Sequence, residues 1–225
     1  MNTVRFSEAL TWLVDLYDGD VRKSSGAPAI HHPLGVCELV MGAGGDEDTA
    51  IAALFHDFGE DKGGVSMLDE IEQRFGARVA RIVDDCSDTL PSDGEDKEPW
   101  VMRKVEHIRH IKSIEDDSRM VLAADTLHNT RDHLRGFRAN GMEWWKNFRA
   151  NVYTDRDLTP EITAASTLWY LNAKSMALLK YSENATLAVE LSRAVQSFQE
   201  SLPLDISTTK WSMALEHISK NYGEL

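Results

Sequence analysis

Apolar residues recur every three or four positions along most of the chain, the spacing that places them on one face of an α-helix. The longest such series is Leu68, Ile71, Phe75, Val79, Ile82 and Val83, and shorter ones run over Leu10, Leu13, Val14 and Tyr17 and over Val36, Leu39 and Val40. Alternating apolar and polar residues, which would indicate strands, do not extend over a useful length. The pattern therefore predicts an all-α protein.

Clusters of glycine and polar residues mark the ends of the expected helices. They lie at 24–27, 42–46, 61–64 and 91–97, and the longest expected loop covers 84–98. Helical spacing resumes at 100–114, 162–179, 185–198 and 211–218. A chain of 225 residues with 42% hydrophobic content is long enough to bury one substantial core. We expect one compact helical bundle over residues 1–180, with 181–225 as a C-terminal helical extension of the same domain.

Four side chains have metal-binding chemistry, and three of them lie at the ends of apolar runs. His56 and Asp57 close a run of five apolar residues, and Asp125 ends another. His32 lies 24 positions before His56, just ahead of a proline that suits the first turn of a helix. Burying these charges without a partner would be costly. The sequence therefore predicts that the four side chains meet around one metal ion.

The predicted shell indicates which ion binds and what it does. Two imidazoles and two carboxylates leave two positions of an octahedral ion open, and these donors favour Mn²⁺, with Fe²⁺ or Zn²⁺ as alternatives. Such an ion polarises a phosphoryl oxygen and acidifies a bound water. Glu60 and Asp61 follow the His-Asp doublet by about one helical turn. We expect Glu60 to take the proton from that water, with Asp61 as its helper.

The other histidines and two adjacent tryptophans have less specific interpretations. His31 and His128 lie close in sequence to the predicted ligands, so they are alternative ligands or hydrogen-bond partners of the ligands. We expect four isolated histidines to be exposed or to cap helices: His107, His110, His133 and His217. Trp144 and Trp145 are typical of helix packing, with the wall of a nucleotide pocket as the alternative.

The net charge of -13 argues against long nucleic acid as a partner, because binding through phosphates depends on clustered Lys and Arg. A small phosphorylated ligand stays compatible with it, since a local basic patch acts within a Debye length of about 10 Å at 0.1 M salt. No membrane-spanning stretch or signal peptide is evident in the sequence. The two cysteines, Cys37 and Cys86, suit buried thiols. We expect a cytoplasmic protein with no membrane partner.

Three motifs occur in an order that resembles the HD-domain phosphohydrolases, and within them the hydrolase domain of the RelA/SpoT family and the small alarmone hydrolases. The first is the basic segment Arg22-Lys23-Ser24-Ser25-Gly26-Ala27-Pro28 followed by His32-Pro33. The second, His56-Asp57-Phe58-Gly59-Glu60-Asp61, is similar to the HD-x-x-ED motif. The third, Asp125-Thr126-Leu127-His128-Asn129-Thr130-Arg131, resembles D-x-LHN-x-R. The likeness covers about residues 5–135.

The resemblance implies an all-helical HD domain that binds Mn²⁺ and removes the 3′-pyrophosphate of (p)ppGpp, leaving GDP or GTP. It implies that His32, His56, Asp57 and Asp125 hold the ion and that Glu60 and Asp61 activate the water. Arg22 and Lys23 would hold the nucleotide, and Asn129 would hydrogen-bond the ribose or a nearby group. Behind the long loop, three cations would close over the pyrophosphate: Lys97, Arg103 and Lys104. Ordinary surface charges are the alternative for these three.

Two departures from the family pattern keep other functions open. Ala29 stands where related sequences often have tyrosine, and Phe58-Gly59 follows the ligand doublet. The alternatives are an HD phosphohydrolase acting on (p)ppApp, a nucleoside phosphate or NADPH, and a catalytically silent domain that binds metal and nucleotide. The expected partner is a small nucleotide, and the sequence leaves a homo-oligomer open.

Overall fold

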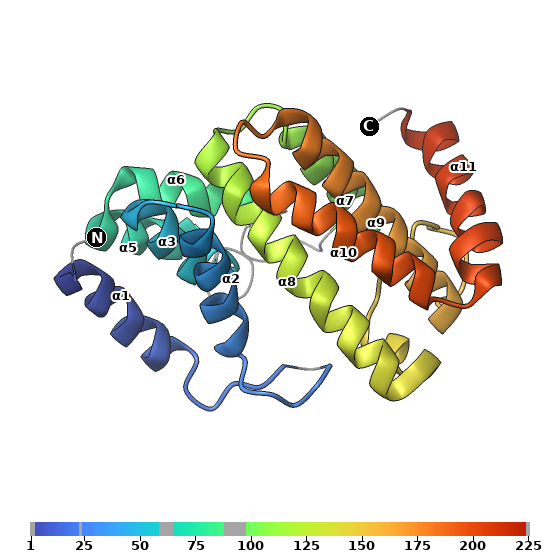
Figure 1. The fold of residues 1–225 in the computed structure, drawn as a ribbon, viewed down its shortest axis with the longest axis horizontal. Helices are drawn as coiled ribbons and strands as arrows, with labels where there is room; N and C mark the ends of the chain where they lie inside the picture. Colours follow the sequence, from blue (N-terminus) through green and yellow to red (C-terminus); the bar gives the residue numbers. More distant parts are fainter. Residues whose placement is uncertain (1–2, 23, 59–64, 88–97, 224–225) are drawn as a thin grey trace.

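The computed structural model describes residues 3–22, 24–58, 65–87 and 98–223 (Figure 1). The predicted all-α class is confirmed, because these residues form helices joined by turns and contain no strand beyond an isolated bridge between Val21 and Pro28. The α-helices are α1 (Thr3–Leu16), α2 (His31–Gly42), α3 (Glu47–Phe55), α5 (Val65–Phe75), α6 (Ala77–Cys86), α7 (Trp100–His110), α8 (Asp116–Asn140), α9 (Pro160–Tyr181), α10 (Thr186–Ser201) and α11 (Trp211–Tyr222). Two short helices of other types, η1 (Gly141–Asn147) and η2 (Ile206–Lys210), complete the described elements.

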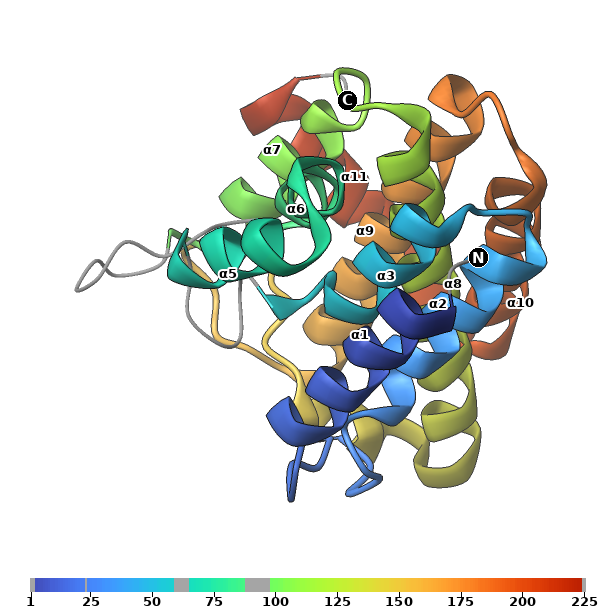
Figure 2. The ribbon, with the colours of Figure 1, turned by 90° about the vertical axis from the view of Figure 1, so that its left-hand side faces the viewer.

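Helix α8 crosses the middle of the molecule and separates two groups of helices (Figure 1). Helices α2, α3 and α6 pack against it from the N-terminal group, and α9 and α10 pack against it from the C-terminal group. Apolar residues on several of its faces are therefore buried, among them Val121, Leu122 and Leu127. Figure 2 shows the same division from the side, with α1, α2 and α3 in front of α8. Because α8 is enclosed on both sides, it holds the polar residues in its middle in fixed positions.

Helix α3 is buried along its whole apolar run, since all five side chains from Ile51 to Phe55 have 0% exposure. It begins at Asp46, whose carboxylate accepts a hydrogen bond from the Thr49 amide, a favourable N-cap. The helix ends at Phe55, and His56 and Asp57 form the turn that follows. The doublet therefore enters its site directly from the core.

An aromatic cluster joins the C-terminal helices to the rest of the molecule. Trp145 of η1 is fully buried and lies against His133 of α8 at 5.3 Å, Phe148 at 5.9 Å and Phe198 of α10 at 5.7 Å between ring centroids. Trp144 is 4% exposed. The helix-packing interpretation of the two tryptophans is therefore correct. Helix α10 packs along both α8 and α9, so residues 186–201 share this core.

Some sequence predictions are wrong in detail. His107 was expected at the surface but is buried on the inner side of α7, and His133 is half-buried among aromatic rings. Helix α6 continues to Cys86, so the loop expected from residue 84 begins later. Both cysteines are free and buried, as predicted. Among the described residues, no helix has the length and apolar character to cross a bilayer.

The α3 cap gives a stability prediction. Partial burial opposes ionisation of Asp46, but hydrogen bonds from Arg78 and Thr49 outweigh it and lower the pKa of Asp46 from 3.8 to about 2. Asp46→Ala should lower the free energy of unfolding at pH 7 by about 1 kcal/mol, because the N-cap is lost. A carboxyl group with a lowered pKa stabilises the folded protein above about pH 4, and this contribution is lost as the pH falls through about 2. The difference in stability between the wild type and Asp46→Ala should therefore shrink in that range.

Urea denaturation of both proteins between pH 7 and pH 2.5 measures this difference. Asp69→Ala, at an exposed position of α5, is the control and should change stability by less than about 0.5 kcal/mol. Equal stability of the Asp46→Ala variant and the wild type at pH 7 would contradict the role of the cap.

Candidate metal centre

Three separate elements bring four side chains to one point, which we call the metal cluster: His32 of α2, His56 and Asp57 after α3, and Asp125 of α8. One ligand atom from each lies within 4.8 Å of the others. The Nε2 atoms of His32 and His56 are 3.1 Å apart. Asp57 lies 3.2 Å from His32 Nε2 and 3.3 Å from His56 Nε2. The Oδ1 atom of Asp125 lies 3.4 and 3.5 Å from the same two nitrogens.

These separations fit ligands of a single divalent ion. Two donors about 2.1 Å from an ion and at right angles to each other lie about 3 Å apart. The mixed nitrogen and oxygen donors suit a first-row transition ion better than Ca²⁺ or Mg²⁺. The cluster can therefore hold one divalent ion, with His32, His56, Asp57 and Asp125 as its protein ligands.

Hydrogen bonds orient both imidazoles for this role. His56 Nδ1 lies 2.9 Å from the Ala53 carbonyl oxygen and must donate to it, which leaves the lone pair on Nε2 facing the cluster. His32 Nδ1 lies 3.0 Å from His128 Nδ1. Burial, followed by the nearby charge of His32, lowers the pKa of His128 to about 4, so His128 is neutral and can accept from His32. Each ligand thus presents Nε2 to the same point.

Electrostatics keep both carboxylates ionised. Burial would raise the pKa of Asp57, but His56 and His32 outweigh it and lower the value to about 2. For Asp125, burial is outweighed first by the charge of Lys174 and then by the two histidines, and its pKa lies well below the usual range. Burial disfavours a charged His56, yet Asp57 and Asp125 raise its pKa to about 9. A divalent ion would replace the imidazole proton as the partner of the two anions.

A second group of donors consists of His31, His128 and Asp132, whose atoms also lie within 4.8 Å of one another. Arg22 reaches to within 3.5 Å of Asp132, and His128 uses Nδ1 toward His32. A guanidinium at this distance opposes a bound cation. The group is therefore better suited to supporting the metal cluster than to binding an ion of its own. This favours the prediction that His128 is a hydrogen-bond partner of a metal ligand.

Asp125 is held by two more side chains. Asn129, one turn later on α8, donates to Asp125 Oδ1 at 2.6 Å and accepts from Arg22 at 3.0 Å. Lys174 of α9 places its ammonium 3.5 Å from Asp125 Oδ2 and is only 2% exposed. In this structure, the amide of Asn129 thus links the predicted nucleotide-binding arginine to the metal cluster.

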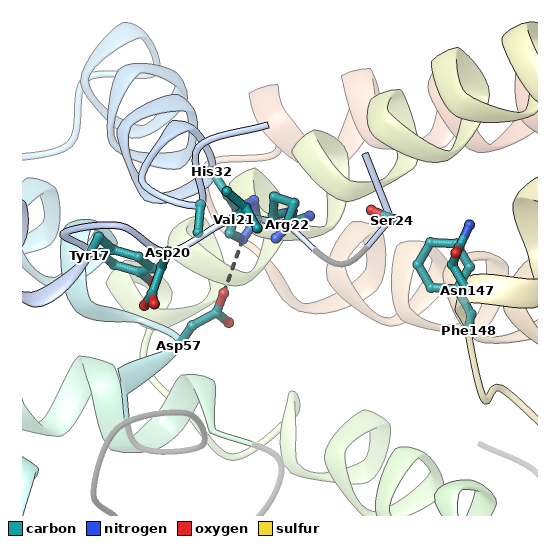
Figure 3. Close-up of a pocket in the computed structure, with 10 residues that line it drawn as sticks. Tyr17, Asp20, Val21, Arg22, Ser24, His32, Asp57, Asn147 and Phe148 are labelled. Atoms are coloured by element: carbon teal, nitrogen blue, oxygen red, sulfur yellow. Dashed lines mark ion pairs between the residues drawn. The ribbon is translucent and has the colours of Figure 1, made fainter. Parts of the chain in front are cut away.

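Two pockets adjoin the metal cluster, and Phe148 lines both. The larger has a volume of about 530 Å³ and includes Arg22, His32 and Asp57. Figure 3 shows Tyr17 and Asp20 at one end of it and Asn147 and Phe148 at the other, with Arg22 and His32 between them. The smaller has a volume of about 280 Å³ and includes Asp125, Asn129 and Lys174.

The structure describes only some of the remaining predicted site residues. Lys23, Glu60, Asp61 and Lys97 lie outside the described residues. Lys104 lines the smaller pocket, with its ammonium 5.0 Å from the centre of the Tyr170 ring. Arg103 is half-buried, donates to the Glu98 carbonyl oxygen at 3.2 Å and is absent from the described walls of both pockets.

Sequence reasoning missed two residues at the site. Lys174 lies between Leu171 and Leu178 on the buried face of α9. A lysine at a position where the helical spacing predicts an apolar residue was the signal that could have identified it. Phe148 follows η1 and carried no motif, so its place between the two pockets could not be read from its neighbours in sequence.

The contact between α2 and His128 gives a second prediction. A Cβ atom at Gly35 would lie 2.4 Å from His128 Cδ2 and Nε2. Gly35→Ala should therefore displace His128 from His32 and weaken binding of a divalent ion by about 10-fold, the typical cost of losing a partner of a ligand. Calorimetric titration with Mn²⁺ measures the affinity. Gly42→Ala, on the same helix with nothing within 4 Å of the added atom, is the matched control.

A model of the HD-domain family matches residues 9–151 of this chain. The guanosine-3′,5′-bis(diphosphate) 3′-pyrophosphohydrolase MESH1 of Homo sapiens is 35% identical over 132 residues, which are 57% of this chain and 66% of that protein. MESH1 of Xenopus tropicalis is 38% identical over 130 residues, which are 56% of this chain and 65% of that protein. The matches thus span somewhat less than two thirds of these relatives.

A solved structure with a similar fold comes from a study of a metazoan orthologue of SpoT that hydrolyses ppGpp. The TM-score is 0.65, the sequences are 21% identical, and the alignment covers 90% of this chain and 99% of the other. At this level of identity, the likeness concerns the fold. It extends beyond residue 151 into the C-terminal helices.

Proposed function

Because this chain belongs to the HD-domain family, we propose that it is a divalent-metal-dependent phosphohydrolase that removes the 3′-pyrophosphate of (p)ppGpp-type alarmones. The observation that carries the proposal is the metal cluster, with four ligand atoms within 4.8 Å beside a pocket containing Arg22. Curated relatives named as pyrophosphohydrolases of guanosine-3′,5′-bis(diphosphate) support the choice of substrate.

The chemistry of the site suits a nucleotide with a pyrophosphoryl group. The bound ion, for which we propose Mn²⁺, would supply Lewis acidity toward a phosphoryl oxygen and a bound water. The protein would hold the nucleotide through Arg22, whose planar guanidinium can stack on a base or bind phosphate. Lys23 and Asn129 would contribute further contacts. Glu60 and Asp61, by their spacing from the ligand doublet, are the proposed acceptors of the water proton.

The larger pocket indicates how the substrate would be oriented. Its volume of about 530 Å³ lies in the usual range for small-ligand sites, and aromatic side chains are placed at both ends, Tyr17 at one and Phe148 at the other. The nucleoside would occupy this pocket, and the scissile ester would face the metal cluster through His32 and Asp57.

The direct test is to incubate purified, Mn²⁺-loaded protein with guanosine tetraphosphate and to separate the products by mass. GDP and pyrophosphate are expected, with no release after chelation and recovery on adding Mn²⁺. A panel containing (p)ppApp, nucleoside phosphates and NADPH sets the substrate preference. Consumption of another nucleotide with guanosine tetraphosphate left intact would reject (p)ppGpp as the substrate and keep the phosphohydrolase.

Glu60→Gln separates an enzyme from a silent binding domain. We expect the variant to keep its affinity for Mn²⁺ and nucleotide and to lose about 100- to 10,000-fold in rate, the usual contribution of a general base. Unchanged turnover in the variant would remove Glu60 from the mechanism. Binding with no turnover in the wild-type protein would favour the silent domain.

A further inference from the structure

Lys174 is a buried cation at the edge of the metal cluster. It lies on the inner face of α9, is 2% exposed, and faces Asp125 Oδ2 at 3.5 Å. Its ammonium also lies 5.5 Å from the centre of the Tyr170 ring. Within the described parts of the chain, Asp125 is the carboxylate that the structure places within ion-pair distance of Lys174. Burying a lysine here is costly unless its charge is compensated.

The charges of the described ligands, together with a bound divalent ion, do not compensate it. A divalent ion carries two positive charges, and Asp57 and Asp125 together carry two negative ones, while both ligand histidines are neutral when they bind an ion. Among the residues that the structure describes at the centre, the sum is zero, so the charge of Lys174 remains as an excess of one. An excess positive charge at a buried centre favours an anionic ligand.

The smaller pocket is placed to receive that anion. Lys174 and Asp125 both form part of its wall, together with Lys104 and Arg149, so three cations line a volume of about 280 Å³. The Tyr170 ring has the ammonium of Lys104 at 5.0 Å and that of Lys174 at 5.5 Å. In a chain with a net charge of -13, three cations around one small pocket form a local site for anions.

We propose that the smaller pocket is a phosphoryl subsite in which Lys174 binds the terminal phosphoryl group of the pyrophosphoryl chain, while the other phosphoryl group faces the metal cluster. This assignment rests on the proposed function and makes Lys174 a specificity-determining residue. A pyrophosphoryl chain can place one phosphoryl group at the cluster and a second charged phosphoryl group against Lys174, so it makes contacts that a monophosphoryl ester lacks. The site would therefore prefer pyrophosphoryl to monophosphoryl groups.

Pyrophosphate and orthophosphate serve as probes of the subsite. Calorimetry on Mn²⁺-loaded protein should give tighter binding of pyrophosphate than of orthophosphate for the wild type. Lys174→Met, which keeps the length and apolar stem of the side chain, should weaken pyrophosphate binding by about 10- to 100-fold, the value of a hydrogen bond to a charged group. Orthophosphate binding should change by less than about 3-fold, so the preference for pyrophosphate over orthophosphate should become smaller in the variant. Lys180→Met, at an exposed position of the same helix, is the matched control and should behave as the wild type.

Affinity for Mn²⁺ alone distinguishes the subsite from a structural role. If Lys174 only held Asp125 in place, Lys174→Met would weaken Mn²⁺ binding and leave the preference for pyrophosphate intact, which would overturn the proposal. The subsite predicts Mn²⁺ affinity that is equal or higher, since a nearby positive charge is removed. Lys104→Met, in the wall of the same pocket, should also weaken pyrophosphate binding, by a smaller factor than Lys174→Met. This second variant tests the subsite if Lys174→Met folds poorly.

The two proposals fail in different ways. Pyrophosphate binding that depends on Lys174, in a protein that leaves guanosine tetraphosphate intact, would reject the alarmone substrate and keep the subsite. Hydrolysis of guanosine tetraphosphate with equal pyrophosphate affinity in wild type and Lys174→Met would reject the subsite and keep the activity.

Discussion

Asp57→Asn is expected to weaken binding of the divalent ion by at least about 100-fold and to lower the hydrolytic rate by about 1000-fold. Asp57 lies 3.2 Å from His32 Nε2 and 3.3 Å from His56 Nε2, so its carboxylate contacts both nitrogen ligands. Asparagine has nearly the same shape, but it removes one negative charge and leaves a weaker oxygen donor. The variant should therefore fold and fail to hold the ion.

Metal analysis after dialysis and calorimetry with Mn²⁺ measure the loss of ion binding, and a rate assay measures the loss of activity. Thermal unfolding of the chelated protein checks the fold of the variant. Asp15→Asn, at an exposed position of α1, is the control and should match the wild type in each measurement. A variant that retains one ion per chain with wild-type affinity would remove Asp57 from the ligand set.

Trp145→Ala is expected to lower the free energy of unfolding by about 3 to 5 kcal/mol, the range for deleting a large buried aromatic side chain. Trp145 is 0% exposed and lies between His133 of α8 and Phe198 of α10. The cavity would separate α10 from α8 and loosen Phe148, whose ring centre lies 5.9 Å from that of Trp145. Because Phe148 lines both pockets, nucleotide binding should weaken as well.

Denaturant unfolding followed by circular dichroism measures this loss. Met176→Ala, at a position of α9 that is 65% exposed, removes a large apolar side chain without opening a cavity and should change stability by less than about 0.5 kcal/mol. A single cooperative transition in the wild type would support residues 181–225 as part of the same domain. A Trp145→Ala variant that is destabilised by no more than the control would contradict the role of this cluster in joining the helices.

The sequence was sufficient for the fold class and for the grouping of the ligand candidates. Helical periodicity identified the helices because each buries one face, and the apolar runs ending at His56-Asp57 and at Asp125 indicated polar groups at the boundary of a core. The spacing rule stays a prediction for Glu60 and Asp61, which lie outside the described residues. The structure places the doublet in a turn directly after α3, where His56 still has α-helical backbone angles.

Local sequence could not reveal contacts made across the bundle. Lys174 meets Asp125 through the packing of α9 on α8, and nothing in the sequence around either residue, 49 positions apart, indicates that contact. His107 has polar and charged neighbours on α7, so its burial depends on which face of that helix turns inward. Arg22 was assigned to a nucleotide from a motif, whereas its contacts with Asn129 and Asp132 follow from a turn that approaches α8.

The attachment of His56 and Asp57 to the fully buried helix α3 has a consequence for the life of the protein in a cell. An ion that binds the native state, and that cannot find its four ligands together in the unfolded chain, raises the free energy of unfolding in proportion to the logarithm of its concentration. Because no loop separates the doublet from the core, losing the ion and losing the core are energetically coupled. Starvation for the metal would therefore shorten the proteolytic half-life of the protein as well as remove its activity.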